Sequence, residues 1–299
     1  MAPLFSIITS CYNSTNTLWA TYQSLLNQSY TNFEWILVDD ASTDAGLTKQ
    51  LIERIAKEAP FRVVTHFFED NHFGSKSTLI GCSIASGIYV GLLDHDDQLP
   101  FNTMEKAAAY IEKYGKFEDI AGICGRCIDE NGKLIGRKFD SDQLVASEPE
   151  IRFKQGITCE LFQFSKLEVI KPFFELMKPG YTNGFVWANI SEKFRYVYVN
   201  DIFRVYDTGL ATSYSNNRSM KISYPIAKAE AIKKVMMIYW PYFKYNPLYG
   251  ARIIASYLRH NINAGTRFSQ ALSELSPALK ACCVFLYPLA IMKSKGWLK

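Results

Sequence analysis

The sequence lacks the glycine-rich loops that many proteins use to hold phosphate groups. Residues 4–9 are strand-like, but neither a Gly-x-Gly-x-x-Gly pattern nor a P-loop follows them. This absence excludes a dinucleotide-dependent dehydrogenase and a P-loop NTPase. A phosphate-bearing ligand would then be held another way, and the usual alternative is a divalent cation bound by one or two carboxylates.

Disulfide frameworks and export signals are also missing. The seven cysteines are an odd number, and their spacing indicates reduced thiols rather than bridges. Cys124-x-x-Cys127 has no second pair at zinc spacing, so we expect two buried core thiols, with a redox or metal site as the alternative. No basic stretch followed by an apolar run opens the chain, which favours a cytoplasmic location.

The chain also lacks a large excess of charge of either sign. A formal net charge of +4 over 299 residues is well short of the positive field that would favour nucleic acid as a partner. Hydrophobic residues make up 48% of the chain, which is enough to bury the core of a large domain.

The first part of the chain alternates short β-rich runs with helical patterns. The expected strands are residues 4–9, 33–38, 61–68, 88–93 and 120–126. Leu18, Leu25, Leu47 and Leu51 have helical spacing in the first two intervening segments. This alternation predicts an α/β fold in which a mainly parallel sheet carries helices on both faces.

Beyond residue 126 the pattern changes. Asn131-Gly132 is a strong turn signal. A helix is expected over residues 166–177, and short strands are expected over 196–199 and 202–206. From Pro225 onward helix dominates. We therefore expect one α/β domain over 1–215 and a helical C-terminal region over 216–299.

Polar side chains gather just after three of the expected strands. They form the segments 10–13, 39–44 and 94–97. Because ligands bind at the carboxyl ends of strands in open α/β sheets, these segments should line one acidic crevice. Asp94-x-Asp96-Asp97 would supply the carboxylates for a divalent cation.

Four motifs carry a family resemblance: Phe5-Ser-Ile-Ile-Thr-Ser-Cys-Tyr-Asn13, Leu25-Leu-Asn-Gln-Ser-Tyr30, Val38-Asp-Asp-Ala-Ser-Thr-Asp44 and Leu93-Asp-His-Asp-Asp97. In this order they resemble the family-two inverting glycosyltransferases, which have the Rossmann-like GT-A fold. Phe73-Gly-Ser-Lys-Ser-Thr78 is similar to a stretch found in a bacterial branch that builds cell-surface polysaccharide.

The resemblance implies a role for each matched residue. Ser10, Tyr12 and Asp40 would surround the nucleotide base, and Lys76 would contact the diphosphate. The other readings are that Asp40 caps a turn, that Tyr12 packs locally and that Lys76 is an ordinary exposed lysine.

In the acidic motif the resemblance implies that Asp96 binds Mn²⁺ or Mg²⁺. Asp94 would reach the ribose or sugar, and Asp97 would support the site. An acidic turn without a ligand is the competing reading. His95 is expected to stay uninvolved rather than bind the metal.

One position departs from the family pattern. The branch usually has Glu-Gly-x-x-Trp where this chain has Asn183-Gly184-Phe185-Val186-Trp187. An amide cannot take the proton of an acceptor hydroxyl, which inverting transfer requires. The acidic alternatives are Glu160, Glu175, Glu192 and Asp201.

Residues 281–292 form an apolar run flanked by Lys280, Lys293 and Lys295. Twelve residues are too few to span a bilayer. We expect a helix that lies at an anionic membrane surface, on the cytoplasmic side, with a core or oligomer-interface helix as the alternative.

The sequence thus predicts metal-dependent inverting transfer of a sugar from a nucleotide diphospho-sugar, UDP-linked by resemblance, to a glycan or lipid-linked acceptor. The alternative, motivated by Asn183, is a donor-binding subunit or scaffold with weak catalysis. The sequence leaves open whether the chain forms homo-oligomers, and nucleic acid is not expected as a partner.

Overall fold

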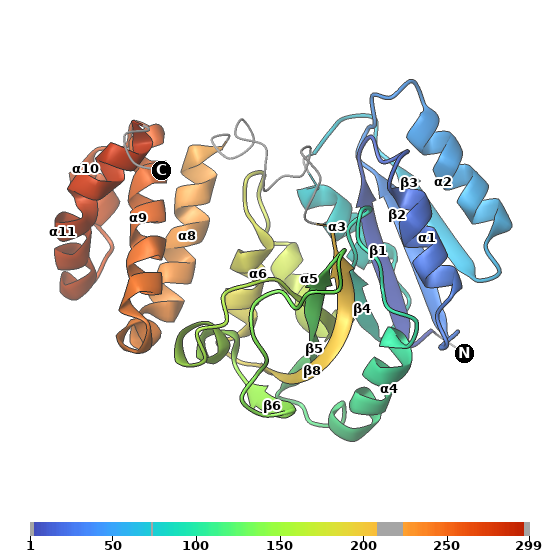
Figure 1. Cartoon of the computed structure of the whole chain (residues 1–299). Coiled ribbons are helices and arrows are strands. Elements are labelled where there is room, and N and C mark those ends of the chain that lie inside the picture. Colours follow the sequence, from blue (N-terminus) through green and yellow to red (C-terminus); the bar gives the residue numbers. More distant parts are fainter. Residues whose placement is uncertain (1–2, 73, 208–223, 296–299) are drawn as a thin grey trace. The chain divides into compact units, whose positions relative to one another are not determined.

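The computed structural model describes residues 3–72, 74–207 and 224–295 (Figure 1). The chain divides into two compact units. The first comprises Met1–Glu148, Ile157–Met177 and Lys193–Gly209, and the second comprises Pro149–Gly156, Lys178–Glu192 and Leu210–Lys299. The boundary expected between residues 215 and 216 lies outside the described residues.

The first unit is built on an eight-stranded sheet of order β3-β2-β1-β4-β7-β5-β8-β6. Its elements are β1 (Phe5–Cys11), α1 (Leu18–Leu26), β2 (Phe33–Asp39), α2 (Leu47–Glu58), β3 (Arg62–Phe67), α3 (Ser75–Ile84), β4 (Tyr89–Leu92), α4 (Thr103–Tyr114), β5 (Ile120–Asp129), β6 (Gln143–Ala146), β7 (Leu161–Lys166), α5 (Leu167–Phe174) and β8 (Arg195–Tyr206). Strand β1 pairs in parallel with β2 and β4, β2 with β3, and β5 with β8. Strand β7 is antiparallel to β4 and β5, and β6 is antiparallel to β8.

Alternation along β1 explains why helices cover both faces of this sheet. Phe5 and Ile7 are buried in the same cluster as Leu18 of α1. Ile8 points to the opposite face, because successive strand residues alternate. There α3 approaches so closely that a Cβ on Gly81 would lie 2.4 Å from Cγ2 of Ile8. The expected α/β class with helices on both faces is confirmed.

Three local predictions need correction. Strands β6 and β7 were not predicted, because their short sequences carry no clear period of two. The two strands expected over 196–199 and 202–206 are one strand, β8, whose register against β5 shifts between the pairs Cys124–Tyr198 and Arg126–Ile202. The polar residues in this bulge had indicated a break in the strand.

The predicted turn and thiols agree with the structure. Gly132 has a φ of 79°, which a glycine adopts without strain. The turn closes with the single bridge Ile128–Leu134, although no regular strand follows it. The seven cysteines all lie within the described residues and form no disulfide, and Cys124 and Cys127 are buried in β5.

The described part of the second unit is helical. It contains η1 (Glu150–Lys154), α6 (Asn183–Ile190), α8 (Pro225–Tyr239), η2 (Trp240–Tyr245), α9 (Pro247–Asn263), α10 (Phe268–Leu272) and α11 (Pro277–Ser294). It has a core of its own, in which Met236 of α8, Leu258 of α9 and Leu279 of α11 are buried together. The expected helical C-terminal region is confirmed.

Candidate functional site

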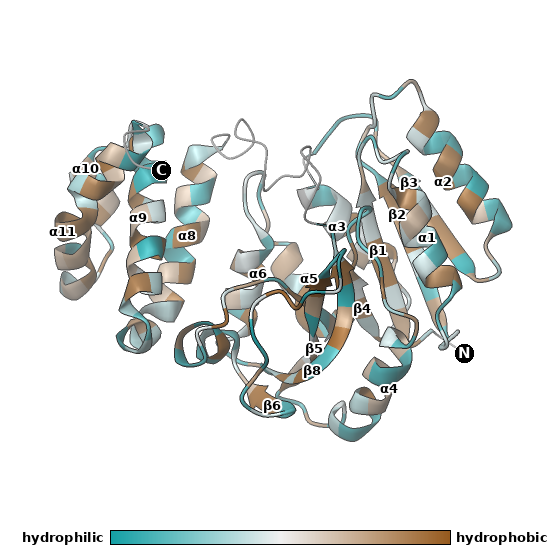
Figure 2. Cartoon of the chain, in the orientation of Figure 1, coloured by the Kyte–Doolittle hydropathy of each residue, from teal (hydrophilic) through white to brown (hydrophobic). Residues whose placement is uncertain are grey.

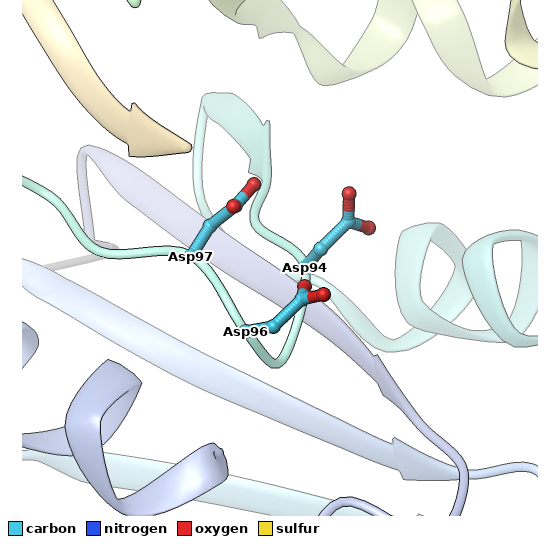
Figure 3. Close-up of side chains that lie close together, drawn as sticks. All are labelled: Asp94, Asp96 and Asp97. Carbon is cyan, nitrogen blue, oxygen red and sulfur yellow. The ribbon is translucent and has the colours of Figure 1, made fainter. Parts of the chain in front are cut away.

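Three carboxylates extend from the loop that follows β4. Asp94, Asp96 and Asp97 each offer an oxygen, and these oxygens lie within 4.8 Å of one another (Figure 3). Asp94 is exposed, Asp96 is half-buried and Asp97 is 1% exposed. Strand β4 lies beside β1 in the sheet, so the loop leaves from the carboxyl edge, where open α/β sheets bind ligands.

Asp97 is paired with a buried arginine. Its Oδ2 lies 3.0 Å from Nη1 of Arg204, and the same nitrogen is 4.0 Å from Oδ2 of Asp94. Burial raises the pKa of Asp97 above its usual range, and the neighbouring guanidinium offsets part of this effect. Arg204 is itself 5% exposed, so the pair stands in a weakly screened environment.

Backbone hydrogen bonds fix the acidic loop to the end of β8. Gln98 and Val205 exchange backbone hydrogen bonds of 3.1 and 2.8 Å. The backbone N–H of Asp207 donates to Oδ1 of Asp97 over 3.1 Å. The loop carboxylates and Arg204 are therefore held in one arrangement by the two segments that carry them.

A fourth carboxylate reaches the same guanidinium from β7. Oε2 of Glu160 lies 3.3 Å from Nη2 of Arg204. Because β7 runs antiparallel to β4, the start of β7 lies at the carboxyl edge where the acidic loop leaves. Glu160 immediately precedes β7, which explains why a residue 63 positions after Asp97 joins the site.

The donor set fits a divalent cation. Mg²⁺ and Mn²⁺ prefer oxygen ligands from carboxylates, and here three carboxylates converge. Oδ2 of Asp97 is buried and lies near Nη1 of Arg204 without an aligned hydrogen bond, so it keeps accepting capacity. A cation bound here would supply positive charge opposite the diphosphate of a nucleotide.

His95 turns away from the three carboxylates. Its Nδ1 lies 2.8 Å from Oγ1 of Thr17, and its backbone carbonyl accepts a hydrogen bond from Thr21. These two contacts connect the acidic loop to the start of α1. The expectation that His95 is not a metal ligand stays a prediction.

The residues expected around the nucleotide base stand at neighbouring strand ends. Ser10 pairs with Val38 across β1 and β2. Tyr12 is 38% exposed, and its hydroxyl lies 3.4 Å from Oγ1 of Thr43. Asp40 follows β2 directly, and its N–H donates to the carbonyl of Cys11. The ring of Tyr12 is thus available to a base at this edge.

Asp40 also organises the loop that leads to α3. Its Oδ1 accepts from the backbone of His72 over 2.8 Å, and its Oδ2 accepts from the backbone of Gly74 over 2.7 Å. Asp40 is 2% exposed. Lys76 is exposed in the first turn of α3, just after this loop. Asp40 therefore contributes to the placement of Lys76, whatever else it binds.

Asn183 is the first residue of α6, in the second unit, and is exposed. Among the alternative carboxylates, Glu192 of the same unit pairs with Lys234 over 3.2 Å. Glu175 is exposed at the C-terminal end of α5 in the first unit. Asp201 accepts hydrogen bonds of 2.7 Å from both Lys106 and Tyr110.

Arg204 is the functional residue that sequence reasoning missed. A signal was present, because an arginine follows Ile202 and Phe203 inside an apolar strand, and arginine is almost never fully buried without a partner. Its partners lie on segments about 40 to 110 residues away, so the sequence alone did not identify them.

Comparisons with known proteins agree on one family. The model of "Glycosyl transferase family 2" matches residues 6–161, about half of the chain. An Escherichia coli protein named UDP-Glc:alpha-D-GlcNAc-diphosphoundecaprenol beta-1,3-glucosyltransferase WfaP is 36% identical over 150 residues, which are 50% of this chain and 54% of that protein. The chain spans about half, or less, of the length of the curated relatives it matches first.

Solved structures agree on the fold. Staphylococcus aureus TarS 1–349 in complex with UDP-GlcNAc has a TM-score of 0.60 and 17% identity, over 96% of this chain and 80% of that one. The Pyrobaculum calidifontis mannosyltransferase PcManGT in complex with GDP-Man and Mn²⁺ has a TM-score of 0.56 and 16% identity, over 99% of this chain and 83% of that one. The fold is therefore GT-A, and with the family match the chain belongs to glycosyl transferase family 2.

Proposed function

We propose that the protein transfers a sugar, with inversion, from a UDP-linked donor to a glycan or lipid-linked acceptor in bacterial cell-surface polysaccharide synthesis. The convergence of Asp94, Asp96 and Asp97 at the carboxyl edge of a GT-A sheet carries this proposal. The name of WfaP supports it, since it states a UDP-sugar donor and a lipid-diphosphate acceptor for a relative.

In this proposal Asp96 binds Mn²⁺ or Mg²⁺, which neutralises the donor diphosphate when bound. Asp97 is held by Arg204 and supports the ion site, while exposed Asp94 reaches the ribose or sugar. Structures of TarS with UDP-GlcNAc and of PcManGT with Mn²⁺ support a nucleotide sugar and a divalent cation in this fold.

The base of the donor would bind between the ends of β1 and β2. We propose that Ser10 and Tyr12 contact it, since the exposed ring of Tyr12 offers a stacking surface. Asp40 would contribute a remaining lone pair, because each carboxylate oxygen already accepts one backbone hydrogen bond. Lys76 would reach the diphosphate as a point charge.

The helix α11 supports peripheral membrane binding. Its exposed residues recur at helical spacing, and Figure 2 shows that much of α11 is apolar. Beyond its first turn, the exposed apolar residues of α11 are Ala281, Val284, Phe285, Pro288, Leu289 and Met292. Its opposite face packs into the second unit's core through Leu279, Cys283 and Ala290. One apolar face is thus anchored and a second is free to enter a lipid headgroup region.

Length and composition alone would let α11 cross a membrane, since it is an 18-residue apolar helix of which 17% is buried. The observed helix is longer than the expected twelve-residue run. Its core-facing residues favour an interfacial position over a span. Lys233 and Lys234 pair with glutamates, so we assign the attraction for an anionic, cytoplasmic leaflet to exposed Lys293 at the helix end.

A second candidate function, donor binding with weak transfer, follows from Asn183. The amide can hydrogen-bond an acceptor hydroxyl but cannot take its proton at neutral pH. In either case the proposed role of Asn183 rests on its match to the family position. The two candidates differ in turnover and agree in donor affinity.

The metal assignment predicts the effect of Asp96→Ala. This change should abolish the divalent-dependent part of UDP-glucose binding, because a diphosphate carrying about two negative charges would meet the remaining carboxylates without compensation. Titration calorimetry with Mn²⁺ and with EDTA measures this. Asp119→Ala, which removes an exposed carboxylate paired with Arg195, is the control. Unchanged, cation-independent affinity in Asp96→Ala would refute the assignment.

The membrane assignment predicts the effect of Phe285→Asp. Phe285 is 82% exposed, so the change should leave the fold intact while it places a charge on the lipid-facing side. Co-sedimentation with anionic phosphatidylglycerol vesicles should fall several-fold, and high salt should weaken it further. Phe101→Asp, at a 66% exposed site in the first unit, should bind like the natural chain. If the natural chain does not co-sediment with these vesicles at low salt, the membrane assignment of α11 is wrong.

The transferase assignment predicts measurable turnover in the natural chain. With UDP-glucose and a GlcNAc-diphosphate-lipid acceptor, UDP release should exceed the acceptor-free rate, and Asn183→Glu should change it by less than about tenfold. Donor affinity should stay the same in both proteins. A nearly inactive natural chain that Asn183→Glu accelerates by about 10² to 10⁴-fold would instead establish the weak-subunit function.

A further inference from the structure

Inverting transfer needs a carboxylate that the family position, Asn183, does not supply. The four acidic alternatives differ in their surroundings. Within the described residues Glu160 shares a partner with the acidic motif, since Nη2 of Arg204 contacts Glu160 while Nη1 contacts Asp97. The two ends of one guanidinium therefore hold the two carboxylates side by side.

The other candidates are engaged or placed elsewhere. Asp201 accepts hydrogen bonds from Lys106 and Tyr110. Burial alone would raise the pKa of Asp201, but these hydrogen bonds lower it below its usual value. Glu192 pairs with Lys234 within the helical unit. Glu175 follows α5, which begins where β7 ends, at the opposite edge of the sheet from the start of β7.

We propose that Glu160 is the general base of the transfer reaction, an inference that rests on the proposed function. Its side chain is 58% exposed, so an acceptor hydroxyl can reach it, while the ion pair with the 6% exposed Arg204 fixes its direction. The backbone supports this placement, because Leu161, the next residue, pairs with Arg126 of β5.

The oxygen of the acceptor hydroxyl forms a bond to the anomeric carbon, and the bond from that carbon to the diphosphate oxygen breaks. UDP leaves with the bonding electron pair. The hydroxyl proton passes to the carboxylate of Glu160, which later releases it to water. Arg204 is a positioning residue, since it touches carboxylates rather than the reacting atoms.

Arg204 contacts both a buried carboxylate and an exposed one. Asp97 is buried against the guanidinium, whereas Glu160 approaches its outer end and stays accessible. Buried Asp97 is suited to hold charge in place. Exposed Glu160 is suited to exchange a proton with a substrate and then with solvent.

The experiment compares Glu160→Gln with the control Glu175→Gln, which removes another exposed glutamate of the same unit. UDP release is measured with UDP-glucose and a GlcNAc-diphosphate-lipid acceptor, and UDP affinity is measured with Mn²⁺. Glu160→Gln should lower kcat about 10² to 10⁴-fold, with UDP affinity and donor KM within about twofold. Glu175→Gln should match the natural chain.

Two further variants separate a base from a merely structural carboxylate. In Glu160→Ala, which opens space at an exposed position, added formate should restore part of the turnover. Formate should not do so in Glu160→Gln, where the amide fills the site. Asn183→Glu added to Glu160→Gln should also raise kcat, because it returns a carboxylate to the family position.

Different failures have different meanings. If UDP fails to bind the natural chain with Mn²⁺, the proposed function falls. If the natural chain binds and transfers but Glu160→Gln keeps more than a tenth of its kcat, the base assignment is overturned and the proposed function stands. Loss of kcat together with UDP affinity would also overturn it, since Glu160 would then serve donor binding.

Discussion

The buried guanidinium of Arg204 is the group on which the site depends. It connects β8, the loop after β4 and the start of β7, three segments that are far apart in the sequence. Taking Arg204 and Asp97 out of water costs several kcal/mol per ion, and their mutual attraction returns this only while both are present. Removing one partner of such a pair typically costs about 3–5 kcal/mol. The geometry of the carboxylates is thus coupled to the stability of the fold.

The acidic residues of the loop after β4 differ in burial, and their proposed roles differ accordingly. Asp97 is nearly inaccessible and pairs with Arg204, whereas Asp96 is half-buried and Asp94 is exposed, which suits the proposed roles of these two in ion and substrate binding. Asp40, at the end of β2, has two roles in this account. Its carboxylate accepts backbone hydrogen bonds from the loop before α3, and it lies next to the expected base site.

Much of the fold and site could be predicted from sequence because the signals are local. Buried parallel strands are continuous apolar runs, and the polar segments after β1, β2 and β4 mark the carboxyl edge directly. The acidic motif was therefore found at once. Strand β7 was not, because it is an antiparallel insertion whose six residues carry no clear period of two. Without β7, nothing in the sequence distinguished Glu160 from the other three acidic alternatives, because its place in the fold comes from the pairing of β7 with β4. Arg204 was missed for the same reason, since its partners are defined by the sheet and not by spacing along the chain.

The most direct test of the central claim is a crystal structure of the protein with UDP and Mn²⁺. The account predicts a cation bound to Asp96 and to the diphosphate, the uracil ring against Tyr12, and Arg204 still holding Asp97 and Glu160. A diphosphate bound without a cation, or a cation bound away from Asp94, Asp96 and Asp97, would contradict it.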